Sequence, residues 1–199
     1  MVGAGQHTVP SGLLRIEDCL DARGGIVLPP GTTLISLIER NIASVGDAVA
    51  YRYLDHSGSG EPHVVELTWA ELGLRLRAVG ARIQELAGRG DRVAVLAPQG
   101  LEYIVGFLGA MQAGFIAVPL SVPLPGSHDE RVSAVITDTS PTVVLTTAAA
   151  FDIAAQNVDD GASMVAVIAV DTLDLDADRD VDDAVTVDGS WLNYRHLTP

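Results

Sequence analysis

The side chains of this 199-residue chain that could act as nucleophiles or metal ligands match no catalytic motif in their spacing. Cys19 is the only cysteine, which excludes an internal disulfide and a cysteine-based zinc cluster. All 12 basic residues are arginine, so no lysine can act as a nucleophile or phosphate ligand. The histidines at loops and element edges lack a ligand spacing such as His-x-x-x-His: His56, His63, His128 and His196. We therefore predict no catalytic, cofactor-binding or metal-binding residue in this chain.

Two further patterns could suggest a ligand site, and both have a simpler interpretation. Gly106, Gly109 and Gly114 do not match Gly-x-Gly-x-x-Gly, and they lie inside or at the end of a predicted helix. They predict close helix packing and a helix stop. The eight aspartates after residue 170 lack the spacing of a calcium-binding loop. They predict a solvated acidic linker or tail over 171–199.

Charge and hydropathy exclude other classes of function. A formal net charge of −14 argues against nucleic-acid binding, which requires clustered cations. Residues 103–127 carry no charge, but Gly114, Pro119 and Pro123 divide this apolar stretch into a helix and a short strand, so we predict no membrane span. The first residues lack the pattern of a secretory signal, and a reducing cytoplasm suits the single thiol. We expect a cytoplasmic protein.

The elements that would position any site begin with a helix and a hairpin. Thr32 or Thr33 can cap a helix whose apolar residues recur at helical spacing up to Val45. Strands are predicted at Ala48–Leu54 and His63–Leu67, joined by a polar turn. Thr68 and Glu71 form a capping box at the start of a helix that Gly88 is expected to end.

Strands and helices then alternate, which predicts a mainly parallel sheet with helices on both faces. We expect strands at Arg92–Ala97, Phe115–Val118, Thr142–Thr146 and Met164–Val170, and helices at Leu101–Ala113, Asp129–Asp138 and Ala148–Asn157. The fold class is therefore α/β with a small N-terminal hairpin. The predicted division is a leader over 1–30, an α/β subdomain over 31–170 and the acidic linker or tail over 171–199.

Several ordered motifs between roughly residues 31 and 175 resemble one family. Leu67-Thr68-Trp69-Ala70-Glu71-Leu72 and Gly90-Asp91-Arg92-Val93-Ala94 are similar to elements near the start of adenylate-forming enzymes. The more particular resemblance is to fatty-acyl-AMP ligases of mycobacterial type, and it is carried by Ala97–Tyr103, Pro119–Pro123, Asp138–Thr142 and Leu145–Thr147. The resemblance implies the N-terminal portion of the adenylate-forming fold.

The resemblance also implies a chemistry. Such enzymes activate a long-chain fatty acid with ATP and magnesium and deliver the acyl-adenylate to an acyl carrier protein of a polyketide or peptide synthase. Trp191-Leu192-Asn193-Tyr194 is similar to the start of the family's phosphate loop, but the Ser-Gly-Ser-Thr cradle does not follow. We therefore expect an N-terminal fragment that is inactive alone, either cut from a longer enzyme or naturally truncated.

The sequence also allows alternatives to an N-terminal fragment of a fatty-acyl-AMP ligase. The chain could be a non-catalytic remnant that binds an acyl chain or a partner protein, or part of an acyl-CoA synthetase. If the chain is truncated, missing sheet partners would leave apolar surface exposed, which would make a homodimer plausible.

Overall fold

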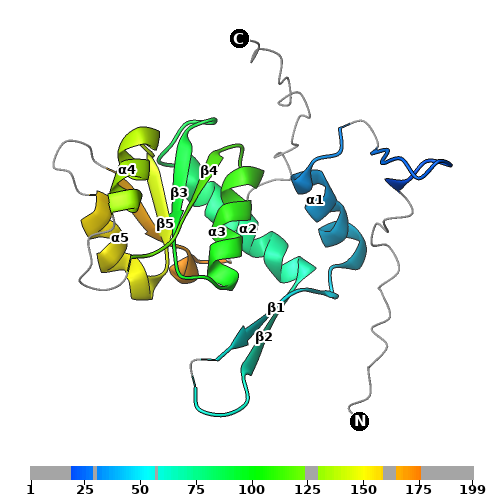
Figure 1. Ribbon diagram of the computed structural model, residues 1–199, viewed down its shortest axis with the longest axis horizontal. Coiled ribbons are helices and arrows are strands. Elements are labelled where there is room, and N and C mark those ends of the chain that lie inside the picture. The colour runs from blue at the N-terminus through cyan, green and yellow to red at the C-terminus, as the bar shows by residue number, and fades with distance from the viewer. Residues whose placement is uncertain (1–18, 29–30, 57, 124–129, 159–164, 176–199) are drawn as a thin grey trace.

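Figure 1 shows the computed structural model, which describes residues 19–28, 31–56, 58–123, 130–158 and 165–175. Its centre is a parallel sheet with the strand order β4-β3-β5-β6. The strands are β3 (Arg92–Leu96), β4 (Ile116–Leu120), β5 (Val143–Thr146) and β6 (Ala166–Ala169). The predicted α/β fold with a parallel sheet is confirmed.

Both faces of the sheet are covered, which explains why its strands show no polar alternation. Val93 and Val95 of β3 belong to one core, whereas Ala94 and Leu96 belong to a second core on the other face. The first core also contains side chains of α2 (Trp69–Gln84) and α3 (Leu101–Gln112). The second contains side chains of α4 (Glu130–Thr139) and α5 (Phe151–Val158), and a 3-10 turn (Ala148–Ala150) precedes α5.

A separate antiparallel hairpin projects from this body, as Figure 1 shows. Its strands are β1 (Val49–Asp55) and β2 (His63–Thr68). Tyr51, Val65 and Leu67 attach one face of the hairpin to the first core, and the Tyr51 ring centroid lies 6.4 Å from that of Trp69. The predicted hairpin is confirmed.

The two helices that flank the hairpin begin as predicted. Thr33 caps α1 (Leu34–Val45), and Thr68 caps α2 through a reciprocal box with Glu71. The predicted end of α2 was wrong, because the helix ends at Gln84 rather than near Gly88. The Gly88 amide donates to the Asp91 carboxylate at 2.9 Å, in a turn that leads directly into β3. The chain must leave the helix earlier to make this turn.

Replacing Thr68 by alanine is expected to lower the free energy of unfolding by about 1 kcal/mol. The Thr68 hydroxyl accepts from the Glu71 amide at 3.2 Å, and the Glu71 carboxylate accepts from the Thr68 amide at 2.9 Å. The Thr68 amide and hydroxyl both donate to the Glu71 carboxylate and lower its pKa, so the contribution of the ionised carboxylate is lost as the pH falls through the lowered pKa. Urea denaturation followed by circular dichroism at neutral pH measures the effect. Thr137→Ala, at an exposed position of α4, is the control, and an equal loss there would contradict the capping role.

Candidate functional site

The strand order creates a switch point between β3 and β5, which are neighbours in the sheet. The segment after β3 enters α3 on one face, whereas the segment after β5 leads to α5 on the other face. In open α/β sheets, ligands bind where the carboxyl ends of two such strands diverge. We define this region, bordered by residues 97–100 and by Thr146 and Thr147, as the carboxyl-edge site.

Two buried hydroxyls distinguish the carboxyl-edge site. Thr146 is 0% exposed and Thr147 is 8% exposed, and within the described residues neither Oγ1 has a hydrogen-bond partner. Leu145 packs toward α3, because its Cδ1 lies 3.4 Å from where a Cβ on Gly106 would stand. Side chains alternate along extended backbone, so Thr147 lies on the α3 side and Thr146 on the α5 side. The sequence did not single out these two residues as a site, because nothing in it shows that both hydroxyls are buried.

Thr146→Val is expected to leave the chain equally stable or to stabilise it by about 1 kcal/mol. The substitution keeps the shape of the buried side chain and removes a hydroxyl whose desolvation no hydrogen bond offsets. Urea denaturation of both proteins measures the difference in the free energy of unfolding. A loss of stability would mean that the hydroxyl is hydrogen-bonded in solution.

The charged groups beside the carboxyl-edge site are mainly acidic. The Asp171 carboxylate accepts from the Ala148 amide at 2.8 Å and thereby ties the end of β6 to the turn after β5. Glu102 stands in the first turn of α3, and its Oε1 lies 3.8 Å from Nη1 of Arg75. Burial raises the pKa of Tyr103, whose hydroxyl is a hydrogen-bond donor at neutral pH in any case. This arrangement can hydrogen-bond a polar group but cannot neutralise a polyphosphate.

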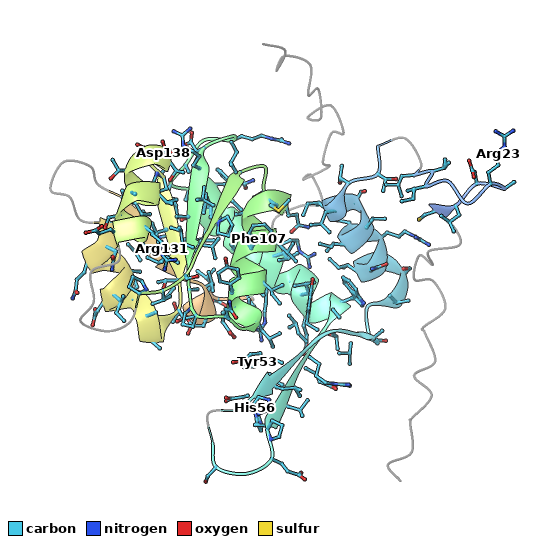
Figure 2. The ribbon with its side chains drawn as sticks, in the orientation of Figure 1. Arg23, Tyr53, His56, Phe107, Arg131 and Asp138 are labelled. Atoms are coloured by element: carbon cyan, nitrogen blue, oxygen red, sulfur yellow. The ribbon has the colours of Figure 1, made fainter. Side chains whose placement is uncertain are left out.

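The described residues do not fit a metal site. Across the described ranges, no group of three or more His, Cys, Asp and Glu side chains could hold a metal ion. His63 begins β2 opposite Asp55, and Figure 2 places His56 on the hairpin, away from the sheet. Cys19 is half-buried in the segment before α1. His128, His196 and the acidic stretch 176–199 lie outside the described residues.

The three glycines that could have suggested a dinucleotide site serve packing and chain reversal. A Cβ on Gly109 would stand 2.9 Å from Val79 of α2, and one on Gly106 would meet Leu145 and Val170. Gly114 follows the end of α3 with φ +87. The predicted close packing is confirmed at Gly109 and the predicted helix stop at Gly114, whereas a Cβ on Gly106 would make only ordinary contacts at 3.4 Å or more.

The uncharged apolar stretch is divided as the sequence predicts. Residues Ile104–Leu120 do not form one helix, because α3 ends at Gln112 and β4 begins at Ile116. No helix in the described part of the chain has the length and apolar character needed to cross a bilayer.

An open parallel sheet with a switch point between β3 and β5 defines a domain of the doubly wound α/β class. Within that class, the AMP-binding enzyme family matches residues 38–196, and the chain belongs to this family. The resemblance to fatty-acyl-AMP ligases is also confirmed, since the chain is 44% identical over 146 residues to the long-chain-fatty-acid–AMP ligase FadD26 of Mycobacterium tuberculosis. That alignment covers 72% of this chain and 25% of the relative.

Other relatives carry related names. The FadD21 protein of Mycobacterium leprae, which is named as a fatty-acid–CoA ligase, is 45% identical over 150 residues, or 74% of this chain and 26% of that protein. A 4-hydroxyphenylalkanoate adenylyltransferase of Mycobacterium marinum is 40% identical over 156 residues, or 76% of this chain and 25% of that protein. The chain therefore spans about a quarter of the length of these relatives.

Solved structures agree on the fold. The fatty acyl-adenylate ligase of Legionella pneumophila, crystallised with acyl adenylate and pyrophosphate, superposes with a TM-score of 0.63 at 24% identity. The superposition covers 72% of this chain and 24% of that structure. The fold of the described residues is therefore that of one part of an adenylate-forming ligase.

Proposed function

We propose that this chain forms the N-terminal α/β part of a ligase that activates long-chain fatty acids as acyl-adenylates. The observation that carries the proposal is the 44% identity to a long-chain-fatty-acid–AMP ligase over 146 residues. Adenylation makes a carboxylate reactive by supplying a phosphate leaving group, and the protein must bring two anions together and stabilise their charge. The domain's contribution is a rigid sheet whose carboxyl edge lines one side of the reaction site.

The groups that bind ATP and magnesium are proposed to lie outside the described residues. The described sheet edge bears the Asp171 and Glu102 carboxylates, and the whole sequence contains no lysine. Among the described residues no group of three or more His, Cys, Asp and Glu side chains could hold a metal ion, so these residues do not fit a magnesium site. We further propose that the enzyme acts in the cytoplasm and that it delivers the acyl group to an acyl carrier protein.

A specific observation supports a second candidate, an acyl-CoA synthetase. The FadD21 relative, at 45% identity, is named as a CoA ligase. The two candidates differ in the acceptor of the acyl group rather than in the first step. A product analysis therefore separates them.

The test is a chimera in which this chain replaces the aligned 146-residue segment of FadD26. The chimera is incubated with a long-chain fatty acid and magnesium-ATP, with and without CoA, and the products are separated by chromatography. Accumulation of acyl-AMP in both reactions supports the adenylation step that the two candidates share, since the rest of the chimera comes from an AMP ligase. Conversion to acyl-CoA supports the synthetase instead, and a folded chimera that forms neither product contradicts both. Adding a holo acyl carrier protein then tests delivery of the acyl group.

A further inference from the structure

The hairpin has an outward face made of four side chains, which we call the hairpin face: Arg52, Leu54, Val64 and Glu66. Leu54 lies directly across from Val64, and Arg52 lies across from Glu66, so the four side chains share one side of the two strands. Leu54 is 47% exposed and Val64 is 46% exposed. On the other side of the hairpin, Tyr51, Val65 and Leu67 pack against the body, whereas Tyr53 is exposed.

An exposed apolar pair on a hairpin favours a covering partner, because burying it removes apolar surface from water. Here the apolar pair stands beside an ion pair in which Arg52 Nε donates to Glu66 Oε1 at 2.7 Å. The arginine and leucine lie on one strand, and the glutamate and valine lie on the other. This arrangement complements itself under a two-fold rotation about an axis parallel to the strands.

We propose that the hairpin face binds a second copy of this chain. The rotation places β1 of one copy over β2 of the other, as in two sheets packed face to face about 10 Å apart. Leu54 then meets Val64 of the second copy, and Arg52 meets Glu66 of the second copy. The two-fold axis makes each of these contacts occur twice. An interface that a two-fold axis generates must be complementary to itself, and the hairpin face satisfies this condition in both hydrophobicity and charge. The proposal does not depend on adenylation.

The small size of the hairpin face determines how tightly the copies associate. Four side chains from each copy bury less area than the interfaces of stable complexes, so the dimer belongs to the weak, concentration-dependent class. Sedimentation equilibrium over micromolar to millimolar concentrations, at physiological ionic strength, is the appropriate measurement. It is expected to show a reversible monomer–dimer equilibrium.

Charge reversal provides the decisive test. Arg52→Glu gives an acidic hairpin face and Glu66→Arg gives a basic one, so each variant repels its own copies. Each dissociation constant is expected to rise at least about tenfold, because like charges across an interface cost several kcal/mol. An equimolar mixture of the two variants is expected to associate again, since the acidic face of one variant then meets the basic face of the other at both symmetry-related contacts.

The mixture separates an interface from a role within one hairpin, because mixing cannot restore an ion pair inside a single chain. The double variant R52E/E66R keeps the ion pair within each hairpin and the ion pairs between the two copies, so it is expected to associate like the original chain. It tests the proposal even if one of the single variants fails to fold. Arg82→Glu, at the far end of α2, makes the same charge change and is expected to leave association unchanged. A chain that stays monomeric at millimolar concentration, or folded single variants that stay monomeric when mixed, overturns the proposal.

Discussion

The purified 199-residue chain is expected to catalyse no acid-dependent exchange of pyrophosphate into ATP. Adenylation requires hydrogen-bond donors and positive charge around the triphosphate as negative charge develops. The sequence contains neither a lysine nor a Ser-Gly-Ser-Thr loop, and carboxylates flank the described sheet edge. Removing a single preorganised donor typically slows an enzyme by about 10²–10³-fold. Because all of these donors and charges are missing, the rate of pyrophosphate exchange should equal that of a reaction without protein.

The assay uses a long-chain fatty acid and magnesium-ATP, with the FadD26 relative as the active control. Omitting the fatty acid defines the background. The chain's circular dichroism spectrum must show folded α/β structure, so that inactivity is not caused by unfolding. Robust exchange that depends on the acid would contradict the prediction, because the chain would then possess a phosphate-binding site.

Gly109→Ala is expected to lower the free energy of unfolding by about 2 kcal/mol, although alanine has a higher helix propensity than glycine. A Cβ at Gly109 would stand 2.9 Å from Cβ and Cγ1 of Val79 and 3.2 Å from the Leu76 carbonyl oxygen. Backbone cannot move aside as a flexible side chain can, so α2 and α3 would have to separate. Urea denaturation followed by circular dichroism measures the loss.

Gly106→Ala is the matched control in the same helix. Its Cβ would meet nothing nearer than 3.4 Å, where Cδ1 of Leu145 lies. With room available, alanine should leave stability unchanged or raise it by about 0.5–1 kcal/mol. Equal losses of stability in Gly109→Ala and Gly106→Ala would show that the close contact between α2 and α3 is not the cause of the loss at Gly109.

Hydropathy and capping patterns predicted the helices and strands because each pattern depends on neighbours in sequence. The box between Thr68 and Glu71 is an example, since both partners lie in one helical turn. The end of β4 differs from the prediction. The sequence predicts an end at Val118, but the strand continues through Pro119 to Leu120. Proline is tolerated there since β4 is an edge strand of the described sheet, and edge position follows from the strand order rather than from the residues themselves.

The carboxyl-edge site could not be predicted from the sequence for the same reason. A switch point exists only once β5 is known to lie beside β3, which follows from pairing between strands that are distant in the sequence. The unpartnered hydroxyls of Thr146 and Thr147 become notable only when both side chains are known to be buried among the described residues. The family motifs could be recognised without this information, which is why function was easier to infer than site geometry.

The most direct test of the proposed function is the rate of pyrophosphate exchange by the FadD26 chimera that carries this chain. Parent enzyme, chimera and isolated chain are compared with the same long-chain fatty acid and magnesium-ATP. If this chain supplies the N-terminal part of a fatty-acyl-AMP ligase, the chimera exchanges pyrophosphate in an acid-dependent manner while the isolated chain does not. A chimera that folds like its parent but shows no acid-dependent exchange would contradict the assignment.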